Sequence, residues 1–172
     1  MINHLEHSIR VANLSFKLAL LLGMPSEEAN SIYKSGLFHD LGKIKINPKI
    51  LNKPARLTDE EFEYIKKHSL YSYKIALGFG FSDAEALNIL FHHENFDGTG
   101  YPIGIKGEEI PLGARIIRIC DMFDALTSDR PYKSKLDLSS AIEIMINEEK
   151  NFDKKIFNVF LEDIKYKGAE VI

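Results

Sequence analysis

The amino-acid sequence predicts an all-α fold, and three observations support this prediction. Apolar residues recur at helical spacing in one segment after another, and no alternating strand pattern, repeat or low-complexity tract occurs. Capping residues or a proline precede several of these segments. A chain of 172 residues, 45% of them apolar, has the size and composition of one domain with a hydrophobic core. We therefore expect residues 1–172 to form one single-domain helical bundle.

The first helix is expected over residues 2–23, where two apolar stripes run at helical spacing. One stripe follows His7 by one helical turn and consists of Val11, Leu14, Leu18 and Leu21. The other consists of Leu5, Ile9, Ala12, Phe16 and Ala19. Because the stripes lie about 200° apart, we expect the helix to be buried on both sides. The second stripe is also a candidate contact for another copy of the chain or for a missing partner.

The second helix is expected to begin with Ser26 as its N-cap and to run to Asp40. Gly42 follows and suits the left-handed turn that often ends a helix. Residues 43–57 are expected to form a loop with a short turn at Pro48.

A capping box at Thr58 starts the third helix, which we expect to break near His68. Ser82 opens the fourth helix, which is expected to end at residues 92–94. Glycines crowd residues 95–110, so we expect an ordered, turn-rich loop there rather than a helix.

The C-terminal part of the chain is predicted to be helical again. Pro111 marks the start of a helix that continues to about Ser128. Two further helices, over residues 138–149 and 154–167, carry no notable chemistry and are expected to complete the bundle.

The net charge and the single cysteine restrict the class of protein. A net charge of −3 provides no basic face for a nucleic-acid polymer, although a few local cations could hold a small anionic substrate. Cys120, expected to be a small core side chain, cannot form an internal disulfide, which favours a reducing compartment. The apolar run at residues 18–22 is too short to span a bilayer, and nearby charges argue against a signal peptide. We expect a cytoplasmic protein with no membrane contact.

Side chains suited to binding metal ions are spread along the chain. They comprise five of the six histidines and two aspartates: His7, His39, Asp40, His68, His92, His93 and Asp121. Imidazole and carboxylate hold divalent transition metals, and this set suffices for two ions. Any one of these histidines is more simply a hydrogen-bonded core or surface residue. Burying the whole set without metal would require an elaborate network of donors, so together these residues predict a metal site.

The adjacent pairs His39-Asp40 and His92-His93 both lie at predicted helix ends. Neighbouring side chains on a helix diverge by about 100°, so each member of a pair can approach a metal centre from its own angle. A carboxylate has two oxygens and can contact two cations, which an imidazole cannot. Asp40 is therefore the candidate bridging ligand.

Several stretches carry motifs: residues 6–11, 38–43, 57–61, 92–94, 97–102 and 121–132. With His68, they closely resemble the HD-GYP domain family, and the resemblance covers nearly the whole chain. The His39-Asp40 pair alone would suggest only the wider HD phosphohydrolase superfamily. The Gly-Tyr-Pro sequence at residues 100–102, placed after the double histidine, is much more specific.

This resemblance implies a helical bundle of the HD phosphohydrolase type that acts as a phosphodiesterase on cyclic di-GMP, a bacterial second messenger. By the same resemblance, the ligands of one metal would be His7, His39, Asp40 and Asp121. Asp40 would bridge to a second metal, whose other ligands would be His68, His92 and His93. Family members with three metals have a glutamate where this chain has Asn3, so we expect a binuclear site. Within this family, a binuclear site would favour opening the ring to linear pGpG.

The expected cofactors are two divalent transition-metal ions, with iron or manganese favoured and zinc as an alternative. Such ions lower the pKa of a shared water and supply hydroxide, so Asp40 would be catalytic through the metals that it holds. Lys43, Arg130 and Lys133 match family positions that contact substrate phosphates. Lys43 and Arg130 would offset charge in the transition state. Tyr101 would either stack on a guanine or pack under the loop at the mouth of the site.

Two other functions stay open at this point. One is a non-catalytic nucleotide-binding or protein-interaction signalling domain. The intact ligand set argues against it, whereas the two apolar faces of the first helix favour it. The other is a phosphodiesterase for another cyclic dinucleotide. The candidate macromolecular partners are a second copy of the chain, forming a homodimer, or an upstream sensory or receiver module, each bound through the first helix.

Three further residues lie close in sequence to candidate ligands. Asp124 is expected to hydrogen-bond a metal ligand or to pair with Lys43 or Lys133. Glu94 either orients a histidine or caps the loop. Ser72 stands where the family has glycine, and we expect little consequence from this difference.

Overall fold

The structure is a computed structural model that describes residues 2–129 and 135–167, with side chains described for residues 5–129 and 135–165. Its α-helices are α1 (Ile2–Leu21), α2 (Ser26–Phe38), α3 (Pro48–Leu51), α4 (Asp59–Gly78), α5 (Asp83–Leu90), α6 (Leu112–Thr127), α7 (Leu138–Asn147) and α8 (Lys154–Lys167). Short 3₁₀ helices are η1 (Leu41–Lys45), η2 (Gly107–Glu109) and η3 (Glu149–Asn151). Every regular element within the described ranges is helical, which confirms the predicted all-α fold.

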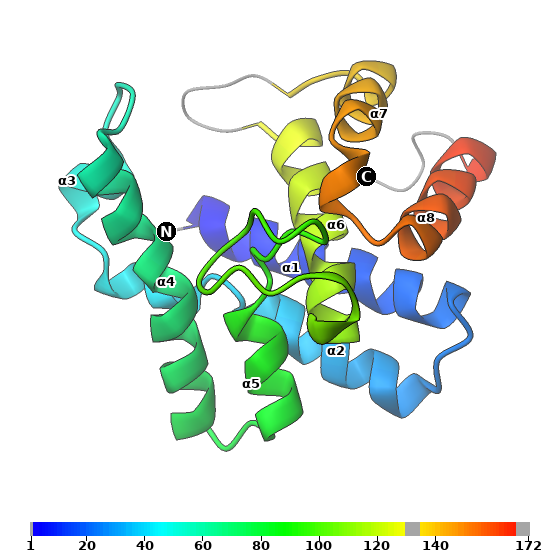
Figure 1. Ribbon diagram of the computed structural model, residues 1–172, viewed down its shortest axis with the longest axis horizontal. Coiled ribbons are helices and arrows are strands. Elements are labelled where there is room, and N and C mark those ends of the chain that lie inside the picture. Colours follow the sequence, from blue (N-terminus) through cyan, green and yellow to red (C-terminus); the bar gives the residue numbers. More distant parts are fainter. Residues whose placement is uncertain (1, 130–134, 168–172) are drawn as a thin grey trace.

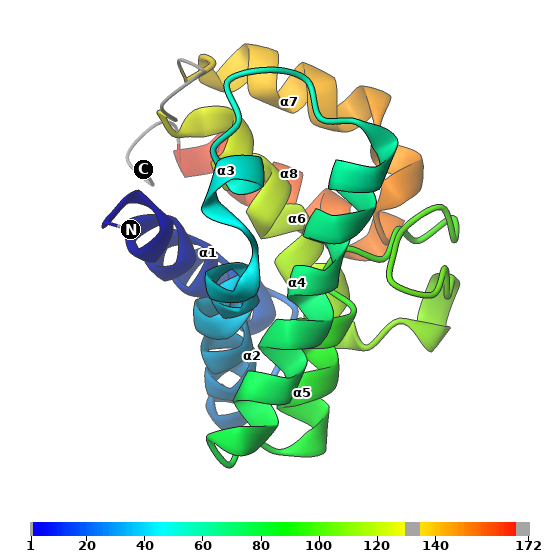
Figure 2. The same cartoon turned by 90° about the vertical axis from the view of Figure 1, so that its left-hand side faces the viewer.

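Helix α6 occupies the centre of the bundle (Figure 1). It packs against α1, α2, α5, α7 and α8. The hairpin of α1 and α2 and the hairpin of α4 and α5 lie beside each other, because α2 also packs along α5. Figure 2 shows α7 and α8 at the opposite end of the molecule from α2 and α5. The two hairpins and α6 together surround the part of the fold that carries the predicted metal ligands.

The hydrophobic core is built mainly where α6 meets α1, α7 and α8. Phe123 of α6 and Phe157 of α8 are among its largest buried side chains. Cys120 is fully buried in the same cluster, and burial raises the pKa of its thiol to about 12. The structure therefore confirms Cys120 as a small core side chain.

Helix α1 is buried on both sides only in its later turns. Ala12 and Ala19 of the second stripe are fully buried, and a Cβ atom at Gly36 of α2 would lie 3.1 Å from the Cα atom of Ala12. By contrast, Leu5 is 60% exposed and Ile9 is 39% exposed. The prediction is wrong for these first turns because α2 ends at Phe38, soon after the close contact at Gly36, and does not cover them.

The sequence predicted the starts of helices more reliably than interruptions within them. Capping boxes form at both Thr58 and Ser82, as the sequence predicts. Ser26 is not an N-cap: Pro25 takes that position and Ser26 is the first helical residue, without a side-chain cap. The predicted break near His68 is also wrong, because α4 continues without interruption to Gly78. None of the helices in the described ranges combines the length and the apolar character needed to cross a membrane.

Candidate metal centre

All of the predicted metal ligands lie together, although they come from separate parts of the chain. They are carried by α1, the turn after α2, α4, the turn after α5, and α6. Their ligand atoms form two groups, and within each group all atoms lie within 4.8 Å of one another. One group is Asp40, His68, His92 and His93. The other group is His7, His39 and Asp121.

Asp40 lies between the two groups, and its two carboxylate oxygens face different histidines. Its Oδ1 atom lies 3.3 Å from Nε2 of His68. Its Oδ2 atom lies 3.5 Å from Nε2 of His39 and 3.7 Å from Nε2 of His7. In the second group, Oδ1 of Asp121 lies 3.2 Å from Nε2 of His7. This arrangement suits a carboxylate that contacts one cation with each oxygen.

Hydrogen bonds at Nδ1 orient four of the imidazoles. The Nδ1 atoms of His39, His68 and His92 each donate to the backbone carbonyl three residues earlier, at 2.6–2.7 Å. Nδ1 of His7 donates to the carboxylate of Asp124 at 2.6 Å. Carbonyl and carboxylate oxygens only accept, so the proton lies on Nδ1. Nε2 is then left to face the cluster, which is how a metal-binding histidine is held.

Several atoms that face the cluster lack hydrogen-bond partners. Nε2 of His39, His68 and His92 and Oδ1 of Asp40 are buried, and no described residue donates to them or accepts from them. A buried polar atom without a partner is costly, and an imidazole lone pair directed at a carboxylate oxygen adds repulsion. A divalent cation would satisfy these atoms together. The mixed imidazole and carboxylate donors therefore fit transition-metal ions.

The charges in the cluster also suit cations. Burial would raise the pKa of Asp40, but Lys43 and the surrounding imidazoles hold it well below its ordinary value. Burial likewise opposes ionisation of Asp121, yet its hydrogen bond and the nearby imidazoles keep its pKa low. Burial depresses the pKa of His92 and of His93 far below the ordinary histidine value. Asp40 and Asp121 are therefore ionised, and His92 and His93 are neutral, which are the forms that bind metal.

His7 is the exception among the imidazoles. Burial would lower its pKa, but hydrogen bonds to Asp121 and Asp124 raise it to about 9. At neutral pH a second proton would lie between Nε2 of His7 and Asp121. A cation that bound these two side chains would replace that proton.

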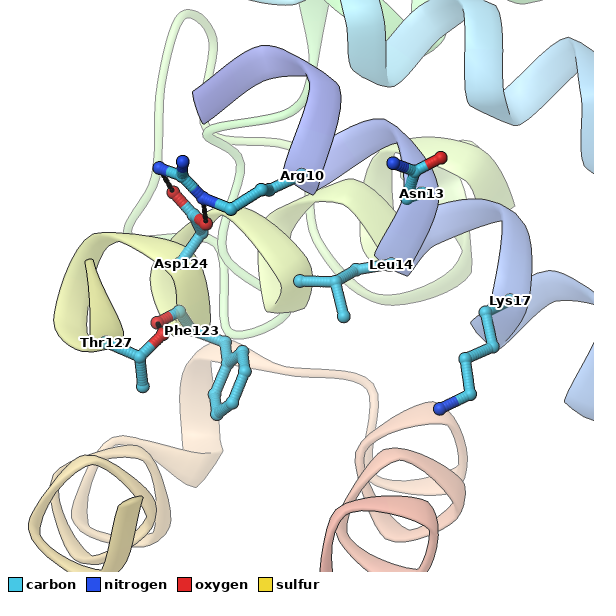
Figure 3. A pocket seen from close by; sticks show the side chains of 7 residues that line it. All are labelled: Arg10, Asn13, Leu14, Lys17, Phe123, Asp124 and Thr127. Carbon is cyan, nitrogen blue, oxygen red and sulfur yellow. Dashed lines mark hydrogen bonds and ion pairs between the residues drawn. The ribbon is translucent and has the colours of Figure 1, made fainter. Parts of the chain in front are cut away.

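Asp124 holds His7 from the side opposite the cluster. Besides accepting from His7, it accepts from Nε of Arg10 at 2.6 Å and from the hydroxyl of Ser128 at 3.1 Å. Figure 3 shows Arg10 and Asp124 facing each other across α1 and α6. The pair borders a cavity of about 270 Å³ that none of the predicted metal ligands lines, so this cavity is distinct from the cluster.

The expected hydrogen bond between Asp124 and a predicted metal ligand is therefore present, with His7 as the donor. The alternative pairing of Asp124 with Lys43 is wrong, because Lys43 donates to Asp40 instead. Arg10 had no functional role in the sequence analysis. One signal could have identified it: Arg10 follows His7 by three residues, as Asp124 follows Asp121, so each shares a helix face with a predicted ligand.

The close approach of η1 to α4 sets the separation of Asp40 and His68. A Cβ atom at Gly42 would collide with the carbonyl oxygen of His68 and lie 2.5 Å from the amide nitrogen of Ser72. The Gly42 amide donates to the Ser72 hydroxyl at 2.7 Å. The predicted left-handed turn at Gly42 is wrong, because its φ is not positive and the contact with α4 requires glycine. Ser72 has a structural role that we did not expect.

The predicted substrate contacts are only partly described. Lys43 donates from Nζ to Oδ2 of Asp40 at 2.5 Å, and its side chain is 24% exposed. Arg130, Lys133 and the side chain of Asn3 lie outside the described parts of the chain. Lys43 is thus the predicted phosphate contact that the structure places beside the cluster.

The loop over residues 95–110 brings Tyr101 to the edge of the cluster. The carboxylate of Glu94 accepts from the amides of Ile103 at 2.8 Å and Gly104 at 3.0 Å. Of its two expected roles, Glu94 therefore caps the loop. The ring of Tyr101 lies against that of His93, with centroids 4.7 Å apart, and it stays partly exposed.

Comparisons with known proteins agree with this architecture. The chain matches the family model described as HD domain over residues 3–156. It is 38% identical over 159 residues to a cyclic di-GMP phosphodiesterase of Pseudomonas aeruginosa, a match that covers 92% of this chain and 38% of that protein. It is 39% identical over 163 residues to 3'3'-cGAMP-specific phosphodiesterase 1 of Vibrio cholerae, covering 92% of this chain and 37% of that protein. The chain spans about two fifths of the length of these curated relatives.

A solved structure shares the fold at low sequence identity. It is an HDGYP protein from Bdellovibrio bacteriovorus, with a TM-score of 0.76, 20% identity, and coverage of 94% of this chain and 52% of that chain. The family match spans most of the sequence and includes His39-Asp40, and the Gly-Tyr-Pro loop at residues 100–102 lies beside the cluster. The chain therefore belongs to the HD domain family, and its Gly-Tyr-Pro loop resembles that of the HD-GYP proteins.

Proposed function

We propose that this chain is a metal-dependent phosphodiesterase that hydrolyses cyclic di-GMP. The observation that carries the proposal is the position of Asp40 between two groups of ligand atoms, with one oxygen directed at each. Paired metal ions are a common arrangement in enzymes that hydrolyse phosphodiesters. The relative named as a cyclic di-GMP phosphodiesterase supports this choice of substrate.

The ligands of the first ion are proposed to be His7, His39, Asp40 and Asp121. The ligands of the second are proposed to be Asp40, His68, His92 and His93. When bound, such ions supply an activated hydroxide and polarise the phosphodiester group. The protein's contribution is to keep the ligands in place: Asp40 fixes the separation of the two groups, and the Nδ1 hydrogen bonds keep the imidazoles oriented.

Lys43 is proposed to contact the scissile phosphate. An ammonium group has three donors, and Asp40 accepts one of them. The remaining donors can offset the charge that grows on the phosphoryl oxygens in the transition state. Arg130 and Lys133 are proposed as further phosphate contacts on the family resemblance alone, and Tyr101 as a stacking surface for a guanine.

The resemblance also supports three finer proposals. We favour iron or manganese over zinc, since mixed imidazole and carboxylate ligands suit these ions better than magnesium. A binuclear site and linear pGpG as product follow from Asn3 at the position of the family's glutamate. The cytoplasm stays the expected compartment because the single cysteine, Cys120, is buried as a thiol.

Hydrolysis of 3'3'-cGAMP is a second candidate activity. A relative with that specificity in its name is as similar to this chain as the cyclic di-GMP enzyme is. A non-catalytic signalling domain is a weaker alternative, because a degenerate site would be expected to lack one of the ligands, and all of them lie together here.

A turnover assay separates these functions. Protein purified without oxygen, with its metal content measured, would be given cyclic di-GMP, 3'3'-cGAMP and a simple aryl phosphodiester. We expect conversion of cyclic di-GMP to pGpG and slower turnover of the other two. Preference for 3'3'-cGAMP would favour the second candidate. Failure of the metal-loaded protein to hydrolyse any of the three would overturn the catalytic proposal.

We also propose that the exposed start of α1 contacts another copy of the chain or an additional module. Leu5 and Ile9 present apolar surface there, and the relatives are longer than this chain. Sedimentation velocity over a range of concentrations tests the homodimer. Self-association that an Ile9→Glu variant loses would support it, and a monomer at every concentration would exclude it.

A further inference from the structure

An aromatic and cationic cluster lies beside the metal ligands, on the side formed by α4 and the loop over residues 95–110. The ring of Tyr101 lies 4.7 Å from that of His93 and 6.4 Å from that of His68, measured between centroids. The ring of Phe62 meets that of Tyr101 edge to face at 6.5 Å. Nζ of Lys66 lies 4.9 Å from the centroid of Phe62 and 5.5 Å from that of Tyr101.

This cluster contributes little to the hydrophobic core. Phe62 is 46% exposed, and the side chain of Lys66 is 26% exposed. An isolated exposed phenylalanine requires no explanation. Phe62 is different because a second aromatic ring and a cation are arranged around it, next to the proposed reaction centre. In addition, no described residue forms a hydrogen bond with the Tyr101 hydroxyl.

The side chains of Phe62, Lys66 and Tyr101 offer contacts that suit a nucleobase. Bases released from a helix stack on aromatic rings in nucleotide-binding proteins, and this contact tolerates every base because each has a π-face. A lysine ammonium group only donates. Guanine offers two acceptors, O6 and N7, on one edge, whereas adenine has an amino donor in place of O6. A stacking surface with a lysine beside it would therefore prefer guanine.

We infer that Phe62, Lys66 and Tyr101 form a subsite for one guanine base of the substrate, with Lys66 as the residue that selects guanine over adenine. The inference rests on the proposed function and goes beyond it by naming residues of α4 that determine specificity. Glu63 accepts one hydrogen bond from Lys66 at 2.5 Å. That contact positions the ammonium group and leaves two donors for the O6 and N7 edge.

The test is a pair of matched lysine variants. Lys66→Met keeps the length of the side chain and removes its donors. Lys67→Met is the control, because Lys67 is the next residue of α4 and also lies over an aromatic ring, that of Tyr64, at 5.6 Å. Affinities of the metal-loaded proteins for hydrolysis-resistant phosphorothioate analogues of cyclic di-GMP and cyclic di-AMP would be measured by calorimetry. Metal content and helicity would be checked in each sample.

We expect Lys66→Met to lower affinity for the cyclic di-GMP analogue on the order of tenfold while changing that for the cyclic di-AMP analogue little. Lys67→Met should leave both affinities unchanged. Phe62→Ala should lower the affinity for both analogues to a similar extent, on the order of tenfold, because stacking does not distinguish the bases. An unchanged ratio of the two affinities in Lys66→Met would overturn the assignment of Lys66, and unchanged affinities in Phe62→Ala would overturn the subsite.

The binding assay separates this inference from the proposed function. If the wild-type protein binds the analogues but never hydrolyses cyclic di-GMP, the proposed function fails, and the affinity ratio still decides the role of Lys66. If hydrolysis occurs and the ratio does not change, only the inference fails. If the metal-loaded wild-type protein binds neither analogue, both fail.

Discussion

At the scale of single residues, Lys43 keeps a buried carboxylate ionised and stays partly open to substrate. Its ammonium group contributes to the low pKa of Asp40 and is only partly buried. We predict that Lys43→Ala retains its metal, because loss of a positive charge makes the cluster more attractive to cations. The rate constant kcat for cyclic di-GMP should fall about 10²–10³-fold, the usual effect of removing a donor to a transition-state oxygen.

Lys45 provides the control for that variant. Lys45 lies on the same 3₁₀ helix as Lys43 and is exposed. The proposal gives it no contact with the metal or the substrate. Steady-state kinetics and metal analysis of Lys43→Ala and Lys45→Ala would be compared. Equal kcat values in the two variants would remove Lys43 from the list of phosphate contacts.

Asp124 is the second residue with a testable role. Asp124→Asn removes the charge that holds Nδ1 of His7 and pairs with Arg10. Residues that orient metal ligands commonly contribute about 10–100-fold to metal affinity, and we expect a loss of that size here. The measurement is a metal titration against a competing chelator.

Asp153→Asn is the matched control, because Asp153 is also buried and pairs with an arginine, Arg115, at 2.6 Å. Both variants should lose some stability towards unfolding. Only Asp124→Asn should lose metal affinity, and equal metal affinity in the two variants would show that Asp124 acts only on stability.

The sequence could predict which histidines and aspartates lie together, but not several of their hydrogen-bond partners. Histidines and aspartates on otherwise apolar helices are unusual enough to be noticed without a structure. The contact of His7 with Asp124 joins residues 117 positions apart and depends on how α1 crosses α6. Phe62 and Lys66 look like ordinary surface residues of a helix until the loop that carries Tyr101 is placed against them.

At the scale of elements, the contact between η1 and α4 controls the geometry of the site. Glycine at position 42 lets the backbone of η1 touch α4 at His68 and Ser72. We predict that Gly42→Ala lowers the free energy of unfolding by roughly 1–3 kcal/mol, the usual range for inserting a methyl group into a packed contact. It should also reduce metal affinity, because Asp40 and His68 are pushed apart. Denaturant unfolding of the metal-free protein gives the first quantity.

Gly78→Ala is the control at the end of the same helix. A Cβ atom at Gly78 would meet nothing within 4 Å, and its φ is not positive. This variant should be neutral or slightly stabilising, by about 0.4–1 kcal/mol. If Gly42→Ala were as stable as Gly78→Ala, the close approach would not be what fixes the site.

Helix starts were predictable because capping is local, whereas interruptions and close contacts were not. Thr58 and Ser82 satisfy amide groups within three residues, so the sequence alone reveals them. The predicted break near His68 had no proline or glycine to cause it, and α4 stays continuous where it packs on η1 and α5. The role of Gly42 depends on a second element and could not be deduced from its neighbours in sequence.

At the scale of the whole molecule, the cluster joins the α1–α2 hairpin, the α4–α5 hairpin and α6. The apolar pattern predicted a helical bundle. It did not predict that the neighbouring helices would leave the first turns of α1 exposed. Because the proposed ligands from all three units converge, metal binding should stabilise the entire fold. We predict that removing the metal with a chelator lowers the midpoint of thermal unfolding. The free energy of unfolding should fall by about 2.7 kcal/mol if the free metal had been present at a hundred times its dissociation constant.

Scanning calorimetry of the metal-loaded and chelated protein measures this difference. Restoring manganese or iron to the chelated sample should restore the original midpoint, whereas magnesium should have a smaller effect, since it prefers oxygen ligands. An identical midpoint with and without metal would indicate that the cluster is already satisfied by protein groups.

The most direct test of the account is the metal content of the wild-type protein and of Asp40→Ala, both purified without oxygen. Elemental analysis by mass spectrometry should give two transition-metal ions per wild-type chain, and the same sample should hydrolyse cyclic di-GMP. Asp40→Ala should lose most of both ions and all turnover, since each group of ligands shares this carboxylate. Full retention of both ions by Asp40→Ala, or hydrolysis by a wild-type sample free of metal, would contradict the account.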